Sequence, residues 1–176
     1  MGSCPMTQTT YPLRPFLPAD TMALRELFAQ SIEELTQDDY DEEQRAAWAS
    51  EAEDAEAFAK RLASMTTIVI QQGGDHLGFA ALKDNKAIDM LFVHPHYGGE
   101  GVGTALCDAL EKIAAARGSD AITVDASESA VAFYEARGYQ ALQRNSIPRG
   151  DVWLTNTSMK KQLKPVAPVA PPSRPQ

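Results

Sequence analysis

Cysteine is scarce in this chain, in which only Cys4 and Cys107 occur among 176 residues. Two cysteines cannot build the disulfide framework that stabilises small secreted folds, and neither stands at a spacing typical of metal ligands. Cys107 falls within a helical pattern, which favours a small buried packing residue. A disulfide scaffold and a cysteine-based metal centre are therefore not expected.

Long apolar runs are absent as well. No segment approaches the ~20 consecutive apolar residues of a membrane-spanning helix. The first ten residues, MGSCPMTQTT, lack the apolar stretch of a secretory signal peptide. We therefore expect no membrane partner and a cytoplasmic protein.

Positive charge is also in short supply. The chain has 16 Lys and Arg against 24 Asp and Glu, a net charge of −8, which argues against nucleic acid as a partner because its binding depends on cationic side chains. Eleven acids lie between Glu33 and Glu56, against the single base Arg45. Such a run is either a solvated helix surface or the source of a field that attracts a cationic substrate.

What the sequence does contain suits one domain with a sizeable core. Residues 1–10 predict a flexible lead, and the Pro/Ala-rich segment 164–176 predicts an extended, disordered tail. The folded domain is expected to span residues 11–163.

Apolar periodicity predicts the elements of that domain, because strands alternate with a period of two and helices with a period of 3.6. Ser127 is expected to cap the last short helix, and the closing hairpin is expected to turn at 148–150. Strands are expected at 11–17, 66–72, 76–83, 87–93, 121–127, 139–147 and 152–163, and helices at 20–35, 40–50, 54–63, 102–117 and 128–138. This order predicts an α/β fold in which helices cover a mixed sheet.

Four glycines fall within residues 98–103, between a predicted strand and a predicted helix. A helix N-terminus presents unpaired amide groups and the positive end of the helix dipole, so a glycine-rich entry to it can bind an anion. A P-loop would need Lys where Thr104 stands, and the dinucleotide pattern G-x-G-x-x-G fails because Leu106 occupies its last position. Neither of these nucleotide sites is favoured.

With its surroundings, the glycine segment resembles the acetyl-CoA-binding motif of the GNAT N-acetyltransferase superfamily: a strand, V-x-P, G-x-G-[hydrophobic]-G-x-x-L and an amphipathic helix. SESAVAFYEARGY (127–139) is similar to the second signature of that superfamily, and the segments IDMLFV and VDAS resemble an uncharacterised bacterial branch of it. The resemblance implies a GNAT-type α/β fold with a mixed, mostly antiparallel central sheet flanked by helices.

The resemblance also implies acetyl-CoA as co-substrate and no metal. Its pyrophosphate would meet the glycine segment, and its pantetheine arm would pair with the preceding strand. Gly98 replaces the usual Gln or Arg and Glu100 stands where a base is common, so weaker binding of coenzyme A is expected. The cofactor-binding residues expected on this basis are Leu91, Phe92, Val93, Gly98, Gly99, Glu100, Gly101, Val102, Gly103, Thr104, Ser127, Ala130, Phe133 and Tyr134.

The chemistry implied by the resemblance is direct transfer of an acetyl group from coenzyme A to an amine. Tyr134 matches the family's phenol that protonates the departing sulfur. Its aromatic ring could equally serve only to pack the helix against the sheet.

Asp89 is the first candidate for the general base, because an acid on an otherwise apolar strand must be paired, raised in pKa or functional. Alternation along the strand places Asp89 on one face with Leu91 and Val93. A salt bridge to a neighbouring base is the alternative role of Asp89. Glu33 and Glu34 are second choices, and a chain of water molecules could replace any of them.

We therefore expect an N-acetyltransferase for a small or peptidic, cationic amine, with its acceptor site between the acidic helices near 30–50 and the closing hairpin. The alternative is a non-catalytic sensor or interaction protein that binds coenzyme A, which the departures at Gly98 and Glu100 motivate. His94 and His96 have no third ligand nearby, so no metal site is expected. A homodimer through the strand 152–159 stays an open alternative.

Overall fold

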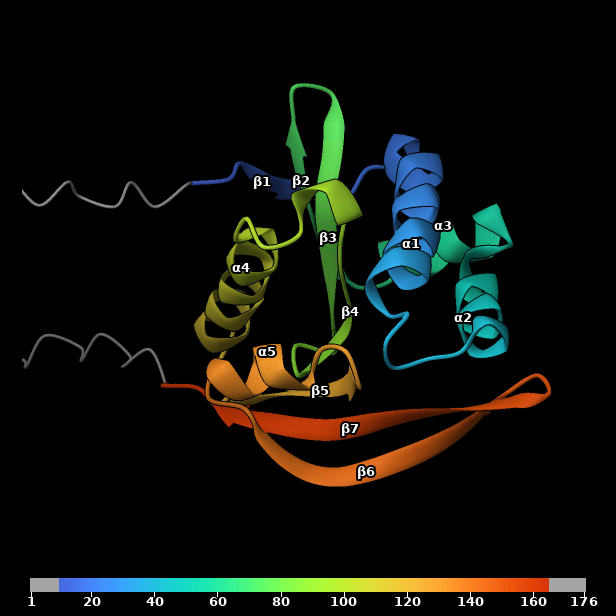
Figure 1. The fold of residues 1–176 in the computed structure, drawn as a ribbon. Coiled ribbons are helices and arrows are strands. Elements are labelled where there is room, and N and C mark those ends of the chain that lie inside the picture. The colour runs from blue at the N-terminus through green and yellow to red at the C-terminus, as the bar shows by residue number, and fades with distance from the viewer. Residues whose placement is uncertain (1–9, 165–176) are drawn as a thin grey trace, which may run out of the picture.

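Seven strands form one sheet in the order β1-β2-β3-β4-β5-β7-β6 in a computed structural model that describes residues 10–164 (Figure 1). All neighbouring strands are antiparallel except β4 and β5, which are parallel. The predicted α/β fold with a mixed, mostly antiparallel sheet is therefore confirmed. The strands are β1 (Leu13–Pro15), β2 (Thr66–Gln72), β3 (Asp75–Lys83), β4 (Ala87–Val93), β5 (Ala121–Ser127), β6 (Gln140–Arg149) and β7 (Val152–Gln162). The predicted lead 1–10 and tail 164–176 fall, apart from Thr10 and Lys164, outside the described residues.

Helices lie on both faces of the sheet (Figure 1). On one face are α1 (Thr21–Leu35), α2 (Glu42–Ala49) and α3 (Ala55–Ala63), and on the other are α4 (Val102–Ala116) and α5 (Val131–Ala136). Short 3₁₀ turns occupy Pro18–Asp20, Ser50–Ala52 and Pro95–Tyr97. Among residues 10–164, none of the helices has the length and apolarity that crossing a membrane requires.

Two apolar clusters, one on each face, hold these helices to the sheet. The cluster under α1 and α3 contains the fully buried rings of Phe28, Phe58 and Phe79. The cluster under α4 contains Leu106, and α4 approaches β3 closely at Gly78, where an added Cβ atom would stand 2.9 Å from Cγ1 of Val102. Only glycine leaves room for this approach, which seats α4 and the loop before it at the end of β4.

The acidic run of 33–56 partly serves the helix ends. Asp41 is the N-cap of α2 and accepts a hydrogen bond of 2.8 Å from the amide of Gln44. Asp54 is the N-cap of α3 and accepts one of 3.0 Å from the amide of Ala57. Carboxylates at these positions satisfy unpaired amide groups and interact favourably with the helix dipole. Part of the negative charge is therefore explained by local helix formation.

The two parallel strands separate soon after they meet. Their register contains only the pairs Ala87–Thr123 and Ile88–Val124, although each strand has seven residues. The amide of His94 donates to the carbonyl of Leu77 on β3 at 2.8 Å. In an antiparallel pair, every second residue turns its amide toward the partner strand. Since the amide of His94 faces β3, the amides of 91 and 93 face the opposite edge of β4. That edge faces the gap from which β5 has moved away.

A β-bulge in β4 alters the predicted orientation of Asp89. The consecutive residues Ala81 and Leu82 of β3 pair with Met90 and Ile88, so Asp89 is an extra residue in β4. A bulge shifts the alternation of side chains by one residue. The prediction that Asp89 shares a face with Leu91 and Val93 was wrong for this reason: those two pack on the α4 side, whereas Asp89 is bonded by Arg61 of α3.

The sequence-based prediction for Ser127 as a helix cap was also wrong. Helix α5 begins only at Val131, with Ala130 as its N-cap and no side-chain cap. Ser127 instead ends β5, where it pairs with Asn156 of β7, and its carbonyl accepts the amide of Ala130 at 2.9 Å. Pairing with β7 thus holds Ser127 in the extended conformation of a strand.

The closing hairpin differs from its prediction in two ways. Strand β6 continues through Pro148 and Arg149, so the turn lies at 150–151 rather than 148–150. Proline is tolerated there because β6 is the edge strand, where an amide donor is not needed. The segment 152–159, considered for dimer contacts, belongs to β7, which pairs on both sides with β5 and β6. A contact between sheet edges at this end would therefore use β6.

Candidate active site

The loop before α4 presents amide groups that are free to bind an anion. Gly99 and Gly101 have φ values of 77° and 85°, in the region that favours glycine, and Gly101 is the N-cap of α4. Within the described part of the chain, none of the amides of 99–104 donates to a protein acceptor, whereas the amide of Ala105 donates to the carbonyl of Gly101 at 3.0 Å. The N-terminal amides of a 15-residue helix are thus open on one side.

The loop is anchored at both ends. The hydroxyl of Tyr11 donates to the carbonyl of Glu100 at 2.6 Å. At the other end, a Cβ atom on Gly103 would lie 3.6 Å from Val93 and 3.7 Å from Phe133. The glycine loop, the end of β4 and α5 therefore meet at one place, as the two sequence motifs predict.

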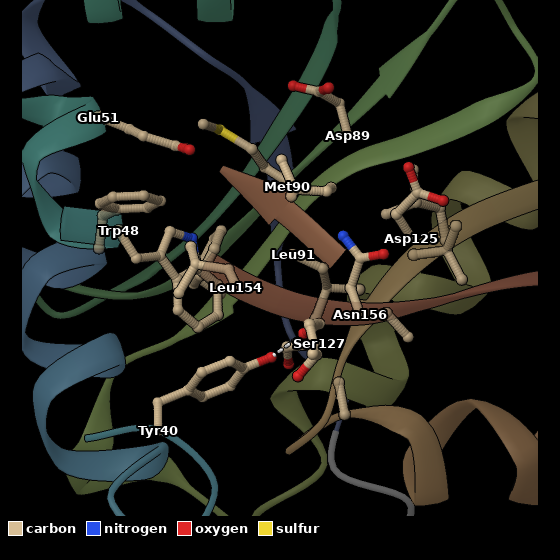
Figure 2. Close-up of a pocket in the computed structure, with 18 of the residues that line it drawn as sticks. Tyr40, Trp48, Glu51, Asp89, Met90, Leu91, Asp125, Ser127, Leu154 and Asn156 are labelled. Carbon is tan, nitrogen blue, oxygen red and sulfur yellow. Dashed lines mark hydrogen bonds between the residues drawn. The ribbon is translucent and has the colours of Figure 1, made fainter. Parts of the chain in front are cut away.

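A cavity of about 240 Å³ lies where β4 and β5 separate. Figure 2 shows Trp48 and Tyr40 on one side of this cavity and Asp125 and Asn156 on the other. The ring of Trp48 lies edge-on to Tyr40, at 5.4 Å between centroids, and to Phe92, at 6.0 Å. Its wall is formed by the helical layer of α1, α2 and α3, by the separated strands β4 and β5, and by the closing hairpin of β6 and β7. Residues far apart in sequence therefore enclose one space.

Tyr134 lines this cavity from α5. Only 3% of the residue is exposed, and its ring packs edge-on to Phe133 and Tyr139, at 5.1 and 5.0 Å between centroids. Its hydroxyl makes no hydrogen bond to any residue in the range 10–164. Burial raises the pKa of Tyr134 well above its ordinary value, so the phenol stays protonated at neutral pH and can donate to a bound group.

Asp89 lies in the wall of the same cavity and is paired with an arginine. Arg61 places Nε at 3.1 Å and Nη2 at 2.9 Å from the same oxygen, Oδ2. Arg61 also lies 3.6 Å from Glu51, which in turn accepts a hydrogen bond of 2.6 Å from Arg149. The salt bridge that was the alternative role of Asp89 is therefore present. Its other oxygen, Oδ1, forms no hydrogen bond with a described residue.

The other predicted site residues divide into two groups. Leu91, Phe92, Ser127 and Ala130 line the cavity together with Tyr134 and Asp89. Glu33 does not, because it is exposed on α1 and pairs with Arg45 at 3.3 Å. The residues of the glycine loop, with Val93 and Phe133, form the second group, next to the cavity.

Several cavity residues were missed by sequence reasoning: Tyr40, Glu51, Arg61, Asp125, Ile147, Arg149 and Asn156. For Asp125 a signal existed, because alternation in AITVDAS places it on one face with Ser127 and opposite the buried Val124. For the arginines no local signal exists, since their role depends on pairing across the fold. Among the described residues, no group of three or more His, Cys, Asp or Glu side chains is placed to hold a metal ion.

Comparisons with known proteins agree with this geometry. A family model described as acetyltransferase (GNAT) domain matches residues 36–163. The uncharacterized N-acetyltransferase YafP of Escherichia coli K12 is 30% identical over 148 residues, which are 84% of this chain and 93% of that protein.

Solved structures show the same architecture. A GCN5-related N-acetyltransferase from Rhodopseudomonas palustris, also described as an aminotransferase of class II, is 51% identical with a TM-score of 0.87 over 90% of this chain and 99% of that one. The PaiA N-acetyltransferase of Thermoplasma acidophilum, solved with coenzyme A, has a TM-score of 0.72 at 18% identity, over 88% of this chain and 99% of that one, and supports the fold alone. On the family match and the curated relative, the chain belongs to the GNAT acetyltransferase family.

Proposed function

We propose that the protein is an N-acetyltransferase that moves an acetyl group from acetyl-CoA directly to a primary amine of a small or peptidic, cationic acceptor. The observation that carries the proposal is the row of unpaired amides at 99–104, set beside a cavity that contains a protonated phenol. An anion site and a proton donor at adjoining places are what a phosphorylated thioester substrate requires.

The chain's own residues fit acetyl-CoA along its length. The amides of the glycine loop would receive the pyrophosphate, helped by the dipole of α4. Gly98, the departure from the family pattern, has φ −63°, and an added Cβ atom would make only an ordinary contact of 3.5 Å with Pro95. A missing side-chain donor there leaves the backbone site intact. The free amides of Leu91 and Val93 would pair with the pantetheine arm as an added strand does.

Each step of the transfer has a residue that can serve it. The acceptor nitrogen loses a proton and attacks the thioester carbon, and we assign Asp89 as the base through its free Oδ1. A backbone amide of β4 would stabilise the oxyanion. As the C–N bond forms and the C–S bond breaks, the nitrogen releases its second proton to solvent and the sulfur receives one from Tyr134, while Asp89 passes the first proton on to solvent. The phenol then recovers its proton from solvent.

The cavity supplies the acceptor site. Tyr40 and Trp48 give it an aromatic wall, and its carboxylates favour a positively charged acceptor. The acidic helices contribute less than their composition suggests, because Glu51 alone of the eleven acids between Glu33 and Glu56 lines the cavity. We therefore attribute the preference for a cationic amine to the cavity rather than to the surface of the helices.

Calorimetry combined with release of free thiol tests the proposal. The purified chain should bind acetyl-CoA with measurable heat and release coenzyme A thiol when an amine from a broad panel is added. Binding without turnover of any amine would instead favour the alternative of a coenzyme A-binding sensor. No heat with either acetyl-CoA or coenzyme A would contradict both functions.

A further inference from the structure

One carboxylate in the cavity has no cationic partner. Three acids line the cavity, namely Glu51, Asp89 and Asp125, together with the two bases Arg61 and Arg149. Arg61 pairs with Asp89 at 2.9 Å, and Arg149 pairs with Glu51 at 2.6 Å. Asp125 forms no ion pair with any described residue and accepts only a hydrogen bond from a serine hydroxyl. The cavity therefore carries one uncompensated negative charge, and it lies on β5.

A chain of hydrogen bonds across three strands holds Asp125. The Nδ2 group of Asn145 on β6 donates to the hydroxyl of Ser158 on β7 at 2.8 Å. That hydroxyl donates to Oδ1 of Asp125 at 2.7 Å. The same Nδ2 group also donates to Asn156 at 2.9 Å, which fixes the amide of Asn145 in place. The carboxylate is thus aimed by neutral donors, which orient it without cancelling its charge.

Asp125 stands at the point where the sheet splits. The last register pair between β4 and β5 joins Ile88 to Val124, so Asp89 and Asp125 are the next residues on the two strands. Both line the cavity, and Figure 2 shows them from β4 and β5 around the same space. One carboxylate is shared with a guanidinium group and the other is open to a ligand.

We propose that Asp125 binds a second positive charge on the acceptor, so that the enzyme selects amines that carry another cationic group, such as linear diamines and polyamines. The inference rests on the proposed transfer to an amine and names the class of acceptor for that same site. The reacting nitrogen must be neutral when it attacks, and a free alkylammonium group has a pKa near ~10.4. The reacting nitrogen therefore cannot remain the cationic partner of Asp125 during the reaction. A second cationic group on the acceptor can.

Pairs of acceptors that differ by one ammonium group test whether Asp125 binds a second positive charge. Thiol release is measured with linear diamines from ethylenediamine to cadaverine, each beside the monoamine in which methyl replaces one ammonium group. The wild type should show a KM at least roughly tenfold lower for the best diamine than for its monoamine, which corresponds to one charged hydrogen bond. In Asp125→Asn this preference should shrink to within about twofold, chiefly because the KM for the diamine rises.

Two further variants complete the experiment. Ser158→Ala should raise the KM for the diamine with little change in kcat, and Ser158→Thr should restore it, because only the hydroxyl that positions Asp125 matters. Asp120→Asn makes the same change of charge on an exposed residue outside the cavity, and it should keep the full preference of the wild type.

Each remaining outcome overturns the inference in its own way. Equal use of diamine and monoamine by the wild type, or an unaltered preference in Asp125→Asn, would show that Asp125 holds no second charge. A fall in kcat for both acceptors in Asp125→Asn would make Asp125 the base. A wild type that binds acetyl-CoA but acetylates no amine would refute the proposed function and the inference together.

Discussion

Arg149 at the end of β6 and Glu51 in the 3₁₀ turn after α2 form a hydrogen bond of 2.6 Å between Nε and Oε1, and both residues line the cavity. The side chains are 44% and 20% exposed, so water weakens the attraction between them. The bond nevertheless joins the closing hairpin to the helical layer. It adds to the hydrogen bonds that Tyr40 and Gln44 donate to the carbonyls of Thr155 and Trp153 on β7, at 2.6 and 2.8 Å.

Loss of this ion pair should affect acceptor binding more than folding. We expect Arg149→Met to raise the KM for the acceptor several-fold and to lower the free energy of unfolding by less than about 1 kcal/mol, as exposed pairs do. A double-mutant cycle with Glu51→Gln measures the coupling. Additive effects of the two single variants would mean that the pair does not act as a unit.

Tyr134→Phe should lower kcat by ~10²-fold if the phenol donates its proton to the sulfur. Affinity for coenzyme A and the melting temperature should change little, because the hydroxyl bonds to no described residue and the ring packing against Phe133 and Tyr139 is retained. Single-turnover kinetics check this, with Tyr139→Phe as a matched control outside the cavity. An unchanged kcat would return Tyr134 to a packing role.

Two glycines of the loop should respond differently to the same added methyl group. Gly101→Ala places a side chain at φ 85°, which costs about 1–2 kcal/mol, and it should weaken the binding of coenzyme A by distorting the row of amides. Gly98→Ala meets no such strain, because its φ is −63° and its nearest contact lies at 3.5 Å. Calorimetry with coenzyme A compares them. Equal affinities would argue that the loop's backbone does not hold the pyrophosphate.

Acid should destabilise the protein partly through Asp20. Hydrogen bonds from Arg14, and then from His76 and the amide of Leu17, hold the pKa of Asp20 well below its ordinary value despite burial. A pKa that is lower in the folded state stabilises the fold above the unfolded value near ~3.9, and this stability is lost as the pH falls below it.

The variant Asp20→Asn gives the measurement. At neutral pH it should lower the free energy of unfolding by roughly 1–3 kcal/mol, because Arg14 loses its charged partner. Between pH ~5 and ~2 its stability should fall less steeply than that of the wild type. Denaturant titrations across this range check both points, and parallel curves would remove Asp20 from the acid response.

Cys107 should be chemically inert while the protein is folded. The thiol is fully buried in α4, and burial raises its pKa to about 12, so almost no thiolate exists at pH ~8. In a Cys4→Ser background, a thiol reagent should react only when denaturant is added. Rapid reaction of the native protein would show that this helix opens locally.

Local patterns in the sequence predict most of the elements and the loop, because period, turn residues and glycine spacing act within a few neighbours. They predict the helix of 102–116 and the hairpin of 66–83 almost to the residue. The spacing of the two motifs also predicts that Tyr134 lies near the glycine loop. Those predictions need no knowledge of distant contacts.

What sequence reasoning missed depends on pairing between distant segments. The bulge that turns Asp89 toward Arg61 is set by the register against β3, and the interior place of β7 is set by both of its neighbours. The lone charge of Asp125 is recognised only once each arginine has been matched to its acid. No single stretch of sequence shows which arginine pairs with which acid, because the partners lie far apart along the chain.

Two rungs of backbone pairing are all that join the first four strands to the last three. So few pairs let the two parts of the sheet move relative to one another, and a molecule bound between β4 and β5 would restrict this motion. The stiffness of the whole protein should then depend on occupancy of the gap. Hydrogen exchange would register this as simultaneous slowing, on loading with cofactor, in strands that never touch it.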